Sequence, residues 1–144
     1  MAERVIEENG LSLVVVKEGN ILFMSTDRGI KPIYTAATGY KKGLNGSCVA
    51  DRVTGRAAAI LCKYGNIEEI HTDVISNEAI RIFKNSGIKY FYEENSQYIK
   101  NRDKTDICPI EKLAYGVDDP QVLIQKISEF IGSIKKEIWY WGLL

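Results

Sequence analysis

Hydrophobic and polar positions divide the first forty residues into a hairpin and a helix. Apolar runs at 11–17 and 21–26 flank Glu18-Gly19-Asn20, a turn-forming segment, and this pattern predicts two paired strands. Between 29 and 39 the pattern is helical, and Pro32 suits the first turn of that helix.

Predicted strands and helices then alternate through the middle of the chain. Ser76 is a natural N-cap and Gly87 a natural helix stop. The predicted order is a strand at 47–50, a helix from Asp51 or Arg52 to Tyr64, a strand at 67–75, a helix at 77–86 and a strand at 88–94. This alternation predicts an α/β fold whose sheet is at least partly parallel.

The C-terminal part has a different pattern. Pro109 should open a short helix that ends near Gly116, and Asp119-Pro120 forms an N-cap and first-position pair for a longer one. Isoleucines then recur at alternating spacings of three and four, at Ile124, Ile127, Ile131, Ile134 and Ile138. This amphipathic helix must dock on its own domain, on a second subunit or on a partner.

We expect one domain over residues 1–144: an N-terminal extension at 1–10, a core at 11–116 and a C-terminal helical extension at 117–144. The chain is 45% hydrophobic and 26% charged, with a net charge of zero, as in globular proteins. A zero net charge argues against general attraction to nucleic acid or to anionic membranes. The start resembles no signal peptide and no run is long enough to span a membrane, so a cytoplasmic location is expected.

Two predicted strand-to-helix junctions organise the middle of the chain. They lie at Val49-Ala50-Asp51-Arg52 and at Ile75-Ser76-Asn77-Glu78. In a mostly parallel sheet both junctions fall at the carboxyl edge, where ligands bind and where free N–H groups favour anions.

The order of elements after the hairpin resembles the cytidine deaminase-like fold. In that fold the first junction carries His-Ala-Glu or Cys-Ala-Glu, and the second carries Pro-Cys-x-x-Cys, which together hold a zinc ion. Here Val49-Ala50-Asp51 and Ile75-Ser76-Asn77-Glu78-Ala79 supply none of the three metal ligands. Cys62 falls about 16 Å beyond Asp51 along the predicted helix, too far to rebuild the site. We therefore expect no metal and no cofactor.

The sequence also resembles an uncharacterised prokaryotic family, a domain of unknown function with a deaminase-like fold and no zinc motif. The matching segments are LVVVKEGNILF, RGIKPIY, ADRVTGRAAA, VISNEA and NRDKTDICPIEK, which together span 13–112. This resemblance implies a three-layer sandwich around a mixed sheet, with a pocket but no established activity. The first nine residues and the tail beyond Gly116 lie outside it.

Candidate binding residues follow from the two junctions. Asp51 is either an N-cap, which we favour, or a stand-in for the deaminase glutamate. Arg52 and Arg56 would share one helix face near the positive end of the dipole, either solvated or bracketing an anion. The bare Gly55 would allow tight packing or a ligand to approach. The proposed lining is Asp51, Arg52, Gly55, Arg56, Ser76 and Asn77, with Arg102 and Asp103 closing over it.

Three functions remain open at this point. The leading hypothesis is a zinc-free binding domain for a small anionic, nucleotide-like ligand at the helix N-termini before Arg52 and Asn77. The second is a metal-independent enzyme on a nucleoside or nucleotide, with Asp51 as general base or Cys108 as nucleophile. The third is an interaction module that forms a homodimer through its C-terminal helix. Neither nucleic acid nor a membrane is an expected partner.

Overall fold

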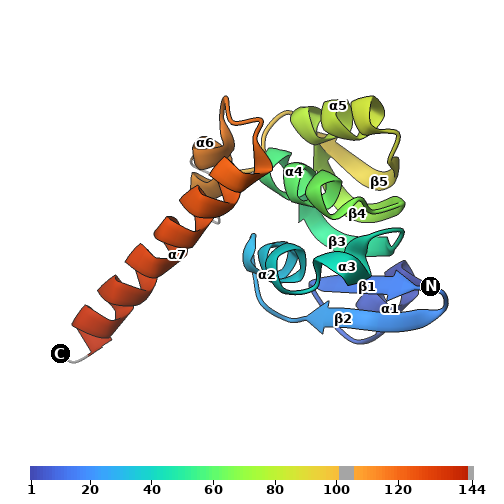
Figure 1. The fold of residues 1–144 in the computed structure, drawn as a ribbon, viewed down its shortest axis with the longest axis horizontal. Helices are drawn as coiled ribbons and strands as arrows, with labels where there is room; N and C mark the ends of the chain where they lie inside the picture. The colour runs from blue at the N-terminus through green and yellow to red at the C-terminus, as the bar shows by residue number, and fades with distance from the viewer. Residues whose placement is uncertain (101–105, 143–144) are drawn as a thin grey trace.

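The computed structural model describes residues 1–100 and 106–142 and contains a mixed five-stranded sheet with the order β2-β1-β3-β4-β5 (Figure 1). β1 is antiparallel to both β2 and β3, whereas β3, β4 and β5 are parallel. The strands are β1 (Leu13–Lys17), β2 (Asn20–Ser25), β3 (Cys48–Thr54), β4 (Glu69–Ser76) and β5 (Lys89–Ser96). The predicted hairpin and the partly parallel sheet are therefore confirmed.

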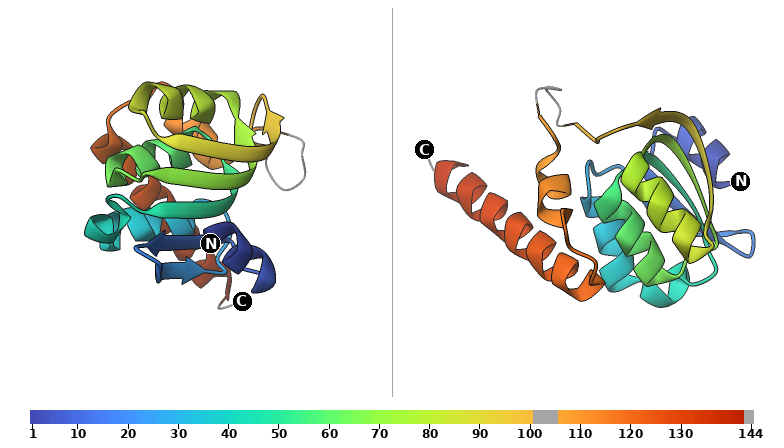
Figure 2. Two further views of the ribbon diagram at one scale, coloured as in Figure 1. Left: turned by 90° about the vertical axis from the view of Figure 1, so that its right-hand side faces the viewer. Right: turned by 90° about the horizontal axis from the view of Figure 1, so that it is seen from above.

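Helices cover the two faces of the sheet unequally (Figure 2). α2 (Lys31–Gly39), α3 (Lys41–Leu44), α4 (Arg56–Gly65) and α5 (Asn77–Ser86) lie on one face, and α1 (Ala2–Glu8) lies on the other. The main core lies under the larger group of helices and includes Leu13, Val49, Leu61, Ile70 and Phe83. Consecutive valines of β1 point to opposite faces of the sheet: Val15 belongs to this core, while Val14 and Val16 pack towards α1.

The first ten residues are part of the body of the domain. Ala2 and Ile6 of α1 are buried and form a second apolar cluster with Val14, Val16 and Ala50. Because α1 covers β1 and β3 on the face that the other helices leave open, the expected N-terminal extension contributes a layer of its own.

The first strand-to-helix junction lies later in the chain than the sequence predicts. β3 continues to Thr54, because Asp51 and Val53 keep their ladder positions opposite Thr72 and Val74 of β4. α4 begins only at Arg56, with Gly55 as its N-cap residue. The predicted helix from Asp51 or Arg52 is therefore wrong, and Gly55 precedes the first turn instead of interrupting the second.

The second junction is confirmed. The Ser76 hydroxyl accepts a hydrogen bond of 3.1 Å from the backbone N–H of Ala79, and α5 ends at Gly87 in the left-handed conformation with φ 70°. Ser76 and Gly87 are local signals, since each lies next to the helix end that it stabilises.

Two helices follow β5. α6 (Pro109–Ala114) begins at the predicted proline, and α7 (Pro120–Gly142) begins after Asp119, whose carboxylate accepts a hydrogen bond of 2.8 Å from the N–H of Gln121. Leu123 and Ile127 are fully buried where α7 contacts α4 and α6. Further along, α7 leads away from the body of the domain (Figure 1).

Candidate functional site

The carboxyl ends of β3 and β4 meet at one edge of the sheet, as the parallel pairing requires. α4 and α5 both begin there, and the end of β5 joins them through Asn95, whose side-chain Nδ2 donates to the side-chain Oδ1 of Asn77 over 2.9 Å. Asn95 also donates to the backbone carbonyl of Ile75 over 3.1 Å. Ser76 and Asn77 thus lie at the predicted edge, and both are held by hydrogen bonds within the chain.

A carboxylate from a distant part of the chain occupies the first turn of α4. Glu111 of α6 accepts a hydrogen bond of 3.0 Å from the backbone N–H of Ala57. A Cβ placed on Gly55 would lie 1.3 Å from the Glu111 Oε1 atom and 2.9 Å from a side-chain carbon of Ile99. Gly55 therefore leaves space for a carboxylate, and the anion that this helix terminus accepts is part of the protein.

Burial of Glu111 opposes its ionisation. Desolvation raises the pKa of its carboxyl group, while hydrogen bonds from the backbone N–H groups of Ala57 and Arg56 act in the opposite direction. Sequence reasoning missed Glu111, although it lies in the most distinctive segment, NRDKTDICPIEK, two residues after Pro109. The available signal was an unexplained glycine at a helix start and an acidic residue in the first turn of another helix.

Arg56 is the most extensively bonded cation of this edge. Its Nε donates to the Ala114 carbonyl over 2.9 Å, and its Nη2 donates to the Val117 carbonyl over 2.6 Å. Its Nη1 lies 3.2 Å from Glu78, and its Nη2 lies 2.8 Å from Asp118. Arg56 thus joins the start of α4 to α5 and to the segment between α6 and α7.

Arg52 has a different role and does not share a helix face with Arg56. Its Nε donates to the Leu11 carbonyl over 3.1 Å, and its Nη2 donates to the Ile6 carbonyl over 3.0 Å. Its Nη1 lies 3.3 Å from Asp73 on the neighbouring strand. Because β3 continues past it, Arg52 points to the α1 face, where it ties α1 to the sheet.

Asp51 lies on the opposite face of β3, the one that Val49 shares with the main core. Burial raises the pKa of its carboxyl group to about 7, although the N–H groups of Arg52 and Val53 hydrogen-bond to it. α4 runs back over β3, so the Asp51 charge helps raise the pKa of the buried Cys62 thiol. The predicted separation of these two side chains along one helix is therefore wrong, and Asp51 is not an N-cap.

The other predicted site residues are placed as follows. Cys108 is half-buried directly before α6, its N–H donates to the Ile99 carbonyl over 2.9 Å, and it packs against the main core. Arg102 and Asp103 lie outside the described residues. Among the residues that the structure does describe, no three His, Cys, Asp or Glu side chains are grouped so that they could hold a metal ion.

A cleft of about 420 Å³ opens beside Arg56, on the outer side of α4. Arg56, Ile60, Lys63 and Tyr64 line it from one face of α4, as spacings of three and four on a helix require. Ile82 of α5 and the segment at 118–120 complete the lining. The cleft therefore combines two cations, an aromatic ring and an aliphatic floor.

One wall of this cleft is formed by an ion pair between Arg56 and Asp118. The Asp118 side chain is 96% exposed, while the Arg56 guanidinium that it contacts is only 15% exposed. At the same end, Gln121 donates to the Tyr64 hydroxyl over 3.2 Å. Arg56 is thus fixed by buried carbonyl groups, while its most exposed partner is a surface carboxylate.

A mixed five-stranded sheet with helices on both faces defines an α/β domain. The chain belongs to the DUF1893 family, a domain of unknown function whose sequence profile matches residues 1–131. The match includes the first nine residues and the first half of α7, which the sequence resemblance left out.

A solved structure supports this assignment. The chain is similar to the crystal structure of a DUF1893 family protein from Thermotoga maritima, with a TM-score of 0.81 and 31% sequence identity, over 89% of this chain and 86% of that one. Comparison with curated proteins gives no match. In the described part of the chain, no helix is long and apolar enough to cross a membrane.

Proposed function

We propose that this protein binds a small anionic ligand with an apolar or aromatic part, of the size of a nucleotide, in the cleft beside α4. The observation that carries the proposal is the Arg56–Asp118 pair at the cleft wall. Asp118 is exposed and can turn into solvent, whereas Arg56 is held in place by the Ala114 and Val117 carbonyl groups. A phosphate or carboxylate can therefore replace Asp118 on a preorganised guanidinium.

The rest of the cleft supports the same ligand class. Ile60 and Ile82 supply the apolar surface of the cleft, and Lys63 supplies a second cation beside it. A volume of about 420 Å³ lies within the range of small-molecule sites. Among the predicted ligand-binding residues that the structure describes, Arg56 lines this cleft, while Glu111 occupies the start of α4.

The arrangement of elements supports a cytidine deaminase-like sandwich without zinc. The hairpin precedes the alternating part of the chain, and β3, β4 and β5 are parallel with helices on their common face. At the observed junctions, Thr54-Gly55-Arg56 and Ser76-Asn77-Glu78-Ala79-Ile80 contain neither the histidine nor the cysteines that hold zinc in that fold. A metal-independent enzyme with Asp51 or Cys108 in its chemistry is the less favoured candidate, because Asp51 faces the core beneath α4 and not the cleft.

Titration calorimetry with cytidine and adenosine monophosphates tests the proposal, with the uncharged nucleosides as matched ligands. Asp118→Asn should tighten binding because it removes the competing carboxylate, and Lys63→Gln should weaken it by up to about fivefold, the scale of an exposed ion pair. Lys84→Gln, on α5 but outside the cleft lining, is the control. Absence of binding by either nucleotide, or equal affinities in all four proteins, would exclude this cleft as the nucleotide site.

A further inference from the structure

The outer edge of β2 carries no neighbouring strand. In the described part of the chain β2 pairs only with β1, so one of its two hydrogen-bonding sides is open. Proteins usually protect such edges with charges, prolines or covering segments, because free N–H and C=O groups pair readily with another strand.

β2 contains neither a charge nor a proline in its sequence, Asn-Ile-Leu-Phe-Met-Ser, although its pairing with β1 is irregular between Ile21 and Phe23. Ile21 and Leu22 are each 42% exposed and Met24 is 59% exposed. Ile21 and Met24 lie opposite Val16 and Val14 on the α1 face of the sheet. Phe23 lies opposite Val15 on the other face, so this edge is apolar on both sides.

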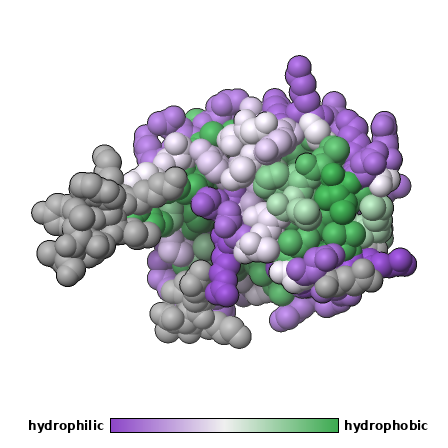
Figure 3. All heavy atoms as spheres, turned by 90° about the horizontal axis from the view of Figure 1, so that it is seen from below, coloured by the Kyte–Doolittle hydropathy of each residue, from purple (hydrophilic) through white to green (hydrophobic). Residues whose placement is uncertain are grey.

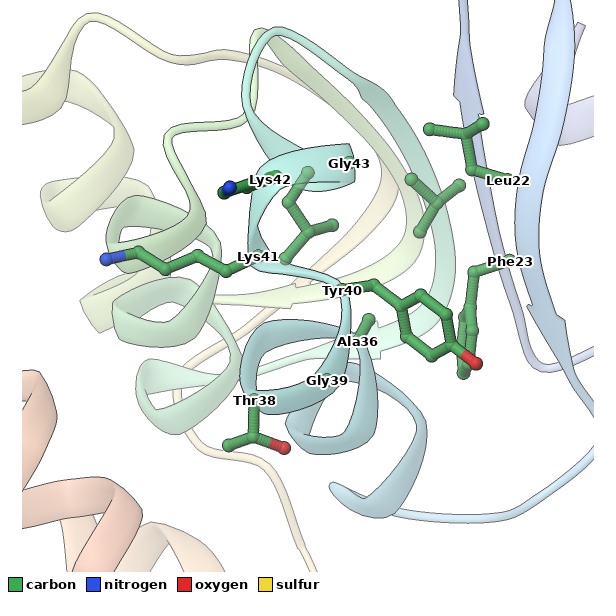
Figure 4. Close-up of a pocket in the computed structure, with 11 residues that line it drawn as sticks. Leu22, Phe23, Ala36, Thr38, Gly39, Tyr40, Lys41, Lys42 and Gly43 are labelled. Carbon is green, nitrogen blue, oxygen red and sulfur yellow. The ribbon is translucent and has the colours of Figure 1, made fainter.

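A shallow apolar groove extends the same surface beneath α2 and α3. It has a volume of about 530 Å³, and Leu22 and Phe23 form one wall (Figure 4). Tyr40 lies against Phe23 with 5.3 Å between ring centroids, while the Lys41 and Lys42 side chains point away from the groove. Apolar side chains gather on this part of the molecular surface (Figure 3).

The opposite edge of the sheet has a different composition. β5 carries Lys89, Glu93 and Glu94 within the strand, together with the exposed Phe91 and Tyr92. Charged side chains within a strand are a usual protection of a sheet edge, and β5 carries them whereas β2 does not. A partner for β2 must be uncharged and apolar on both faces, and in the described sheet β2 itself fits that requirement.

We infer that the open edge of β2 pairs with β2 of a second copy of this chain, antiparallel about a twofold axis. A six-residue strand gives a ladder of about 20 Å, the usual length of a strand. The pair would join two sheets into one of ten strands and would cover Ile21, Leu22 and Met24 on both copies. This inference does not depend on the ligand cleft, which lies beside α4.

Light scattering after size exclusion tests the inference on the full chain. The wild type should have a mass of about 32 kDa, twice the 16.2 kDa of one chain. Met24→Lys and Ile21→Lys should each raise the dimer dissociation constant at least tenfold without altering the circular dichroism spectrum, because both side chains are already exposed. Phe91→Lys, a matched substitution on the other edge, should remain dimeric.

A fourth variant distinguishes a dimer formed through β2 from a dimer formed through α7. Ile134 is 38% exposed beyond the point where α7 leaves the body, so Ile134→Lys should leave the β2 dimer intact. A monomeric wild type at 100 μM, or a dimer that resists Met24→Lys, would overturn the inference. A dimer that Ile134→Lys dissociates and Met24→Lys does not would assign the contact to α7 instead.

Discussion

The first turn of α5 is capped by its own neighbour in the chain, whereas the first turn of α4 is capped by a carboxylate 54 residues away. Both junctions end a parallel strand and begin a helix at the same sheet edge. The Ser76 hydroxyl accepts a hydrogen bond from the Ala79 N–H, and both groups belong to the same turn of the chain. Glu111 satisfies the α4 amide only once α6 has packed, so this junction depends on tertiary structure that its own sequence does not contain.

The contrast extends into the strands before the junctions. β3 carries Asp51 beneath α4, and the residue opposite it on β4 is the neutral Thr72. Two carboxyl groups with raised pKa values therefore lie beside α4, Glu111 at its first turn and Asp51 near Cys62. The β3–α4 junction should respond to pH and to changes in α6, while the β4–α5 junction should respond to neither.

The largest expected effect comes from filling the space above Gly55. Gly55→Ala should lower the free energy of unfolding by about 3 kcal/mol, because the added methyl group would displace the Glu111 carboxylate and crowd Ile99. Urea denaturation followed by circular dichroism measures the loss. In a Glu111→Ala background the same substitution should cost clearly less, and an equal cost in both backgrounds would show that the two residues are not coupled.

A smaller effect should appear in the pH dependence of stability. Because burial raises the pKa of Asp51 to about 7 from an ordinary value of 3.8, the folded state favours the protonated carboxyl group. Its contribution to stability should therefore be complete below about pH 4 and should be lost as the pH rises through about 7. Asp51→Asn should be more stable than the wild type at pH 8 and nearly equal to it at pH 4. Chemical denaturation at both values measures this, and a pH-independent difference would contradict it.

The smallest effect is expected at the local cap. Ser76→Ala should lower the free energy of unfolding by about 1 kcal/mol, the usual value of a side-chain N-cap. The loss should be the same at pH 4 and pH 8, because no titrating group caps α5. A pH-dependent loss at Ser76 would remove the proposed difference between the two junctions.

The sequence predicts well those features whose causes are local. The hairpin turn, the Ser76 cap, the Gly87 stop and the Asp119-Pro120 helix start were all confirmed, and each depends on residues within one turn. Membership of a family of unknown function was confirmed as well, over a longer part of the chain than the quoted motifs.

The errors occur where distant segments decide the structure. Asp51 and Arg52 resemble a helix start, yet pairing with β4 extends the strand to Thr54, and the Ile6 and Leu11 carbonyl groups hold Arg52. Glu111 could not be assigned because nothing near it in sequence indicates that its partner is the N–H of Ala57. Arg56 was expected either to be solvated or to bracket an anion, and the carboxylates that it contacts are Glu78 and Asp118 of the same chain.

The long C-terminal helix gives the Arg56–Asp118 pair a mechanical consequence. Asp118 lies two residues before Pro120, where α7 begins, and a helix of 23 residues is about 34 Å long. A tilt of about 10° at Pro120 would displace the far end of α7 by about 6 Å, given that length. The ion pair thus lies next to the start of α7, and a change in helix orientation too small to alter the sheet would produce a larger displacement at the far end of α7.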